Sequence, residues 1–189
     1  MTNIIKNDKD FKEAIGAFII AFSELEFGLA FLCSTTEFDL RFKDKYLPKY
    51  LGFSFDQKMK HLSEYIDEHL LEFKPTWSKL KVEIGQLNRE RRFFAHGFML
   101  YSLPRETITT HIREKGKITT KNQSLQEIKS LTNRLRHLNT GENGINGEFH
   151  TEFTKARINN WNELVNDDAK IVYRVNSEIV SNWKGKENI

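Results

Sequence analysis

The stretch QLNRERRFFAHG, residues 86–97, combines a helical apolar pattern with a dense group of basic side chains. Apolar positions leading into and through it recur at spacings of three and four, the period of an amphipathic helix. These positions are Trp77, Leu80, Ile84, Leu87, Phe94 and Phe98. Arg91 stands in this series between Leu87 and Phe94, where the pattern predicts an apolar side chain. Because an unpaired buried charge is costly, we expect Arg91 to have a partner, a ligand or water.

The other basic side chains of this stretch share a second face of the expected helix. Arg89, Arg92 and His96 follow one another at spacings of three and four residues. Gly97 marks the expected end of the helix, and a cation is favoured near a helix C-terminus. The stretch therefore predicts a helix whose last turns concentrate cationic and titratable groups.

The composition of the whole chain predicts one globular domain. Its 189 residues are enough to bury a sizeable core, and 39% of them are hydrophobic. A net charge of +3 does not by itself indicate a nucleic-acid-binding protein. Cys33 is the only cysteine, which excludes an internal disulfide and a cysteine-based zinc site. We expect a single domain over residues 1–189, with a core at about 10–139 and a C-terminal helical extension at about 150–183.

The N-terminal region predicts neither a signal peptide nor a membrane anchor. The polar segment Asn7–Asp10 precedes the first apolar run. The longest apolar run, Ala14–Phe22, is about half of what a membrane-spanning helix needs. We therefore expect a soluble, cytoplasmic protein with no membrane partner.

The first helix is expected from about Asp10 to Cys33, opened by a capping box of Asp10 and Glu13. Its main apolar seam consists of Phe11, Ile15, Phe18, Phe22, Leu25, Leu29 and Leu32. A second apolar stripe contains Ile20, Phe27 and Phe31, so the pattern predicts a central, buried helix. Glu24 falls inside the second stripe, and either burial with a partner or extension to the surface fits this position.

Further helices are expected after this one. Residues 34–52 include Pro48 and are interpreted as a connection. A second helix is expected over about 54–73, and Pro75 suits the first turn of the helix that carries the basic stretch. Another helix is expected from Ser124 to Gly141.

A short hairpin interrupts the helical pattern. Alternating β-branched residues at 107–113 and 117–120 predict a polar-faced hairpin, interpreted as an appendage. Its basic residues either touch RNA or are only solvated; they are Arg113, Lys115, Lys117 and Lys121. After a loop at 141–147, helices are expected at about 153–165 and 168–183. The fold class is therefore all-α: a bundle of four to five core helices with a small β-hairpin appendage and extra C-terminal helices.

Glu24 and Arg91 admit two interpretations. The first is a buried ion pair that fixes the register of two packed helices, with His96 placed only at a helix end. The second is phosphate chemistry, because arginine offers fixed donors to phosphate and histidine titrates near neutral pH. RNA supplies its own nucleophile, the 2′-hydroxyl, so acid–base groups and cations suffice for its cleavage without a metal.

The segment ERRFFAHG, Glu90–Gly97, resembles the Arg-x4–6-His signature of HEPN (higher eukaryote and prokaryote nucleotide-binding) domains, whose commonest local form is Arg-Asn-x-x-Ala-His-Gly. The first helix with Ser23–Glu26, and the Phe55-x-x-Lys58 opening of the second, are also similar to many members. The resemblance covers about Phe11 to Leu138. It departs from the family pattern at Arg92, where Asn, Asp or His is usual.

The resemblance implies a HEPN-like helical bundle that dimerises through the motif helices and forms a composite site in a cleft. Catalytic members are metal-independent endoribonucleases, often toxins or phage-defence effectors, and others are non-catalytic modules. A two-fold axis supplies His96 twice, which suits acid–base cleavage. The implied partners are RNA and, for a toxin, an antitoxin or a nucleotidyltransferase. We expect no cofactor and no metal site.

On this basis we expect His96 to act in proton transfer and Arg91 to bind or orient phosphate. Arg92 and Arg89 add positive charge for RNA binding, and Glu24 supports the site. The rival interpretation is a non-catalytic HEPN-like module that binds RNA, a nucleotide or a partner protein in the same cleft. The third is a purely structural bundle with a buried pair of Glu24 and Arg91.

Overall fold

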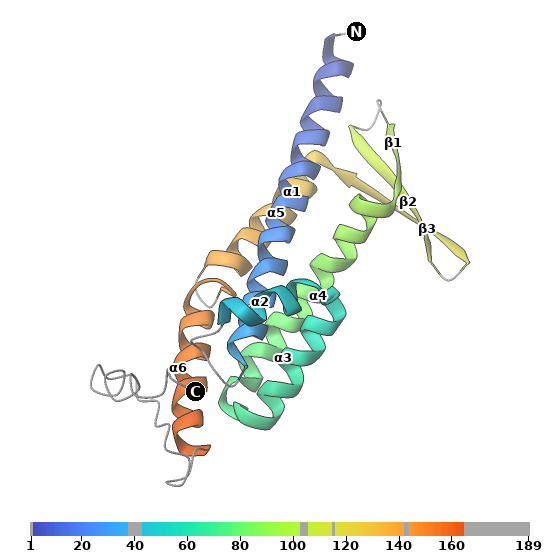
Figure 1. Cartoon of the computed structure of the whole chain (residues 1–189). Coiled ribbons are helices and arrows are strands. Elements are labelled where there is room, and N and C mark those ends of the chain that lie inside the picture. The colour runs from blue at the N-terminus through green and yellow to red at the C-terminus, as the bar shows by residue number, and fades with distance from the viewer. Residues whose placement is uncertain (1, 38–42, 103–105, 115, 142–143, 165–189) are drawn as a thin grey trace. The chain divides into compact units, whose positions relative to one another are not determined.

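Helices dominate the computed structural model, which describes residues 2–37, 43–102, 106–114, 116–141 and 144–164 (Figure 1). The helices are α1 (Thr2–Thr35), α2 (Lys43–Leu51), α3 (Phe55–His69), α4 (Lys74–His96), α5 (Leu125–Thr140) and α6 (Glu148–Leu164), with a 3-10 turn η2 (Leu71–Phe73). The strands are β1 (Phe98–Ser102), β2 (Thr107–Glu114) and β3 (Lys117–Ser124). The sequence predicted an all-α class; the chain is mostly helical, with a small three-stranded antiparallel sheet. The helix predicted at 168–183 and Lys115 lie outside the described residues.

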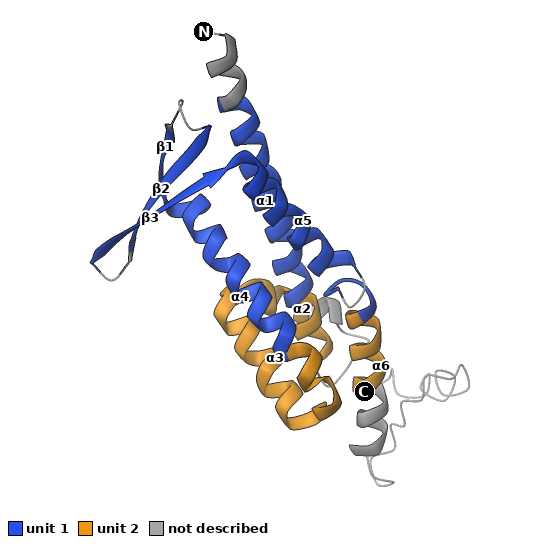
Figure 2. Ribbon diagram, turned by 180° about the vertical axis from the view of Figure 1, so that it is seen from behind, with its two compact units in different colours: residues 1–29, 78–148 blue, residues 30–77, 149–189 orange. Residues whose placement is uncertain are grey.

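The chain divides into two compact units, drawn in different colours in Figure 2. Unit 1 contains residues 1–29 and 78–148, and unit 2 contains residues 30–77 and 149–189. Helices α1 and α4 each contribute to both units, so neither unit is one continuous segment of the chain. The single domain over residues 1–189 stays a prediction.

The core of unit 1 is built on the predicted seam of α1. Its seam residues in this unit that are nearly inaccessible to solvent are Phe11, Phe18, Phe22, Leu25 and Leu29. The rings of Phe18 and Phe94 pack edge to face with their centroids 5.1 Å apart, which joins α1 to the basic end of α4. Helix α5 lies beside α1. It follows the predicted capping box at Ser124 and ends at Thr140, with Gly141 as its C-cap.

The prediction that α1 is buried almost all round is wrong. Ile20 is 62% exposed and Phe27 is 49% exposed, because α5 borders only one side of this second stripe. The segment Asp8–Thr35 is long and apolar enough to cross a membrane by length and composition. A core helix of a soluble protein passes the same test, and the cytoplasmic location stays a prediction.

The sheet begins directly after α4. Its order is β1-β2-β3 with antiparallel pairing, and Phe98 lies opposite His111, which lies opposite Thr120. The predicted hairpin is confirmed as β2 and β3, but β1 was missed because Phe98 extends the helical spacing of α4. Gly97 makes the transition: a Cβ there would lie 2.2 Å from Thr110 Cγ2 and 2.4 Å from the Phe93 carbonyl oxygen, so no side chain fits.

Unit 2 contains the capping box at Ser54 that the sequence predicts. The buried side of α3 consists of Met59, Leu62 and Ile66 together with Lys58. The interpretation of residues 34–52 as a connection is wrong in part, because they include α2. Pro48 lies inside α2 and has no N–H to donate, so this short helix lacks one backbone hydrogen bond.

Candidate functional site

The last turns of α4 carry a row of exposed basic side chains. Arg89, Arg92 and His96 are all exposed, and their spacing places them along one face of the helix, as predicted. His96 is the last residue of α4, and the Gly97 N–H donates to the Phe93 carbonyl 2.9 Å away. Row R denotes these three residues. It places two guanidinium groups and one imidazole where a solvent-borne ligand can reach them.

Arg91 lies beside row R and is half-buried. Its Nε–H donates to Asn88 Oδ1 at 3.1 Å, and its Cζ lies 5.0 Å from the centroid of the Phe22 ring. A guanidinium over an aromatic face is favoured electrostatically, by about 0.5–2 kcal/mol depending on solvent exposure. The Arg91 guanidinium, which interrupts the apolar series, is therefore in contact with an aromatic ring and an amide oxygen. Among the described residues, the other N–H donors of Arg91 have no hydrogen-bond partner.

The expected ion pair between Glu24 and Arg91 is wrong. Glu24 is exposed, and its carboxylate pairs with no cation among the residues that the structure describes. The surface alternative holds for Glu24, which lines an open groove between α1 and α5. Its backbone carbonyl accepts from Asn146 Nδ2 at 3.4 Å. Glu24 therefore does not neutralise the motif arginine within one chain.

Glu90 ties the motif helix to the sheet, a contact that sequence reasoning missed. Its carboxylate pairs with Lys121 Nζ on β3 and accepts from Gln123 Nε2 at 3.2 Å. Lys121 Nζ also lies 5.9 Å from the centroid of the Phe93 ring. One lysine of the predicted basic hairpin therefore serves to hold β3 against α4.

The face of α4 that carries row R continues toward the N-terminus as an open surface. Val82 is 62% exposed, and a Cβ on Gly85 would have nothing within 4 Å. Ser78 and Val82 also line a shallow groove between α4 and α5, which Glu83 and Arg134 close with an ion pair of 3.3 Å. Small and apolar residues thus precede the basic ones along one face of the helix.

Row R and Arg91 offer hydrogen-bond donors for an anion and one side chain of the type that transfers protons near neutral pH. Among the described residues, no group of three or more His, Cys, Asp and Glu side chains is placed to hold a metal ion. The donors of row R and Arg91, with the imidazole of His96, suit phosphate binding and proton transfer.

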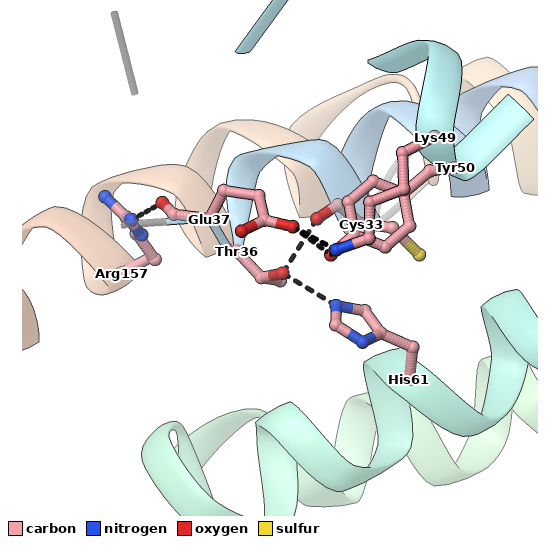
Figure 3. Close-up of polar contacts among 7 residues, drawn as sticks. All are labelled: Cys33, Thr36, Glu37, Lys49, Tyr50, His61 and Arg157. Atoms are coloured by element: carbon pink, nitrogen blue, oxygen red, sulfur yellow. Dashed lines mark hydrogen bonds and ion pairs between the residues drawn. The ribbon is translucent and has the colours of Figure 1, made fainter. Parts of the chain in front are cut away.

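A second polar cluster lies in unit 2 and was not predicted (Figure 3). Tyr50 donates its hydroxyl hydrogen to Glu37 Oε1 at 2.5 Å, and Lys49 Nζ donates to the same oxygen at 2.7 Å. The Thr36 hydroxyl lies 2.7 Å from the Cys33 carbonyl oxygen and 2.7 Å from His61 Nε2. Because a carbonyl only accepts, Thr36 donates to Cys33, and His61 Nε2 must then carry the hydrogen shared with Thr36.

The pKa directions in this second cluster favour fixed charges at neutral pH. Burial raises the pKa of Tyr50 to about 12. Burial also raises the pKa of Glu37, but hydrogen bonds from Lys49 and Tyr50 outweigh it and lower the pKa overall. Burial and the charge of Lys49 lower the pKa of His61, and burial raises the pKa of Cys33 to about 12. Tyr50 and the Cys33 thiol therefore keep their protons, and the cluster is a structural network.

No family model, curated protein or solved structure matches the chain. The residues at the end of α4 and the chemistry open to them are consequently the basis for a functional proposal.

Proposed function

We propose that the chain is a HEPN-type, metal-independent endoribonuclease that acts in the cytoplasm as a two-fold dimer, as a toxin or phage-defence effector. The observation that supports it most is row R: Arg89, Arg92 and His96, exposed together at the end of α4. Arg91 adds a fourth cationic or titratable group next to this row. The resemblance of the segment Glu90–Gly97 to the HEPN motif gives these residues their proposed roles.

The chemistry follows from the substrate. The 2′-oxygen of RNA attacks the adjacent phosphorus, the bond to the 5′-oxygen breaks, and a 2′,3′-cyclic phosphate and a 5′-hydroxyl are formed. One His96 accepts the proton of the 2′-hydroxyl, and His96 of the partner subunit donates a proton to the leaving 5′-oxygen. Arg91 and Arg92 donate hydrogen bonds to the non-bridging phosphate oxygens, where negative charge builds up in the transition state.

The dimer in this proposal uses the open face of α4. Val82 and Gly85 offer an apolar, sterically open approach for the same helix of a second copy. Row R follows on the same face, so a two-fold axis along it brings two copies of His96 toward one substrate. An antitoxin or a nucleotidyltransferase that restrains the enzyme belongs to the same proposal.

One residue favours the second candidate function, a non-catalytic HEPN-like module that binds RNA, a nucleotide or a partner protein. Arg92 replaces the Asn, Asp or His that usually follows the motif arginine. A guanidinium holds phosphate as well as an amide does, but it cannot accept a hydrogen bond. Loss of that acceptor affects catalysis more than it affects binding.

Incubation of the purified protein with RNA in EDTA tests the proposal. We expect cleavage that leaves a 2′,3′-cyclic phosphate, and none in a matched oligonucleotide whose scissile nucleotide is 2′-deoxy. Cleavage of the 2′-deoxy oligonucleotide contradicts the mechanism, and inhibition by EDTA contradicts metal independence. Binding of RNA without cleavage selects the non-catalytic module instead.

A further inference from the structure

One face of the sheet presents large apolar side chains to solvent directly after the motif. Phe98 on β1 is 67% exposed, Leu100 is 48% exposed, and Ile118 on β3 is 73% exposed. The opposite face is covered at β2, where Ile108 and Ile112 are buried. An aromatic ring that stays this accessible is unusual enough in a folded protein to suggest a binding surface.

The surroundings of Phe98 are held in place by cross-strand contacts. His111 lies directly opposite Phe98, and its Nδ1 lies 2.8 Å from Thr120 Oγ1 on β3. Two pairs along, on the same face, the Thr109 hydroxyl donates to Asn122 Oδ1 at 2.6 Å. The ring therefore stands at the edge of a preorganised polar surface, which lowers the entropy cost of binding a flat ligand.

The charges near this face suit a polyanion. Arg113 is exposed on β2 and lies opposite Ile118 on this face, and row R ends two residues before Phe98. The nearest motif carboxylate, Glu90, is already paired with Lys121. Glu106 is exposed at the start of β2, at the other end of that strand from Arg113.

We propose that this sheet face binds unpaired nucleotides of single-stranded RNA, with one base stacked on Phe98 and its neighbouring phosphate at row R. This inference rests on the proposed function and names its substrate class. A base in a duplex is already stacked on both sides and cannot cover the Phe98 ring, whereas a base in a loop or a single strand can. Leu100 extends the apolar contact, and Arg113 binds a phosphate farther along the strand.

The test measures dissociation constants for a fluorescent, 2′-O-methyl single-stranded RNA, which the proposed mechanism cannot cleave. Loss of one stacked base weakens binding about 5- to 150-fold, which is the effect expected of Phe98→Ala. Phe98→Trp retains a ring and should bind as tightly as the wild type. Phe27→Ala is the control, because it removes another exposed ring, from α1, and should leave the dissociation constant unchanged.

Each outcome decides between the inference and the function on which it rests. Equal affinity of wild type and Phe98→Ala, or preference for a duplex of the same sequence, overturns the inference. If Phe98→Ala converts a dimer to a monomer in light scattering, the face is an interface between copies, and the inference is again overturned. If the RNA binds as expected but ordinary RNA is not cleaved, the inference stands and the endoribonuclease proposal fails. If ordinary RNA is cleaved and Phe98→Ala does not change the cleavage, the endoribonuclease proposal stands and the inference fails. A wild-type protein that binds no RNA overturns both.

Discussion

Two polar clusters of this protein contain similar residue types but differ in how their polar groups are satisfied. In unit 2, the polar groups of Glu37, Tyr50 and Lys49 bond to one another. At the end of α4, by contrast, Arg89 and His96 extend into solvent. Because polar groups that bond to one another stabilise a fold and solvent-exposed cations do not, the first cluster is structural and the second is accessible to a ligand.

The largest expected effect separates the two clusters by their histidines. His96→Ala should lower the rate of RNA cleavage at least about a hundredfold, because it removes the proton-transfer group, and should leave the melting temperature nearly unchanged. His61→Ala should lower the melting temperature and leave the cleavage rate unchanged, since His61 bonds to Thr36 in the network of unit 2. Cleavage rates and thermal unfolding of both variants test this, and equal cleavage rates in the two would break the distinction.

Tyr50→Phe tests whether the network of unit 2 supports the fold. The variant removes the hydroxyl that donates to the Glu37 carboxylate, a hydrogen bond to a charged group worth about 1.5–3 kcal/mol. We expect the free energy of unfolding in urea to fall by about that amount, with RNA cleavage unchanged. Tyr101→Phe is the control and should cost less, because Tyr101 on β1 is exposed and its hydrogen bond to Asp8 faces solvent. A neutral Tyr50→Phe would show that the network adds no stability.

Acid should weaken the same network. The folded pKa of His61 is lowered below its ordinary value of about 6.5, so below that pH the unfolded chain binds the proton more readily and stability falls. The folded pKa of Glu37 is also lowered below its ordinary value. The carboxylate therefore adds a further loss of stability in more acidic solution, as the pH falls through the folded pKa of Glu37. Melting temperatures between neutral pH and pH 5 should decline, and less steeply in His61→Gln. His137→Gln, at an exposed histidine of α5, should decline as steeply as the wild type; a decline as shallow as that of His61→Gln would assign the effect to another group.

The smallest effect is expected at Glu24. Because Glu24 is exposed and forms no ion pair with Arg91 in the described residues, Glu24→Gln should change the free energy of unfolding by no more than about 0.5 kcal/mol. Breaking a buried ion pair would instead cost about 3–5 kcal/mol. Urea unfolding of the variant distinguishes the two values.

Local sequence patterns predicted the elements that local physics controls. The capping boxes at Ser54 and Ser124 are present because each needs only residues within one turn. The same is true of the exposed spacing of Arg89, Arg92 and His96, which the helical period alone determines. The end of α4 at His96 was predicted from Gly97. The structure shows why glycine stands there, because a Cβ would collide with Thr110.

Contacts between distant segments were beyond the sequence. The partner of Arg91 was expected to be a carboxylate, but the ring of Phe22 fulfils that role, and no spacing rule distinguishes the two. Phe98 fitted the helical series of α4, yet pairing with His111 places it in β1. The network around Glu37 joins residues from three segments, each unremarkable on its own.

A subunit-mixing titration tests most directly the central claim that two copies of His96 form one site. Wild type and His96→Ala are mixed in equal amounts, exchange of subunits is verified with a tag, and RNA cleavage is measured in EDTA. Random pairing leaves two intact histidines in about one quarter of the dimers, so we expect about one quarter of the wild-type activity. Retention of about one half would mean that each subunit cleaves with its own His96, which contradicts the composite site.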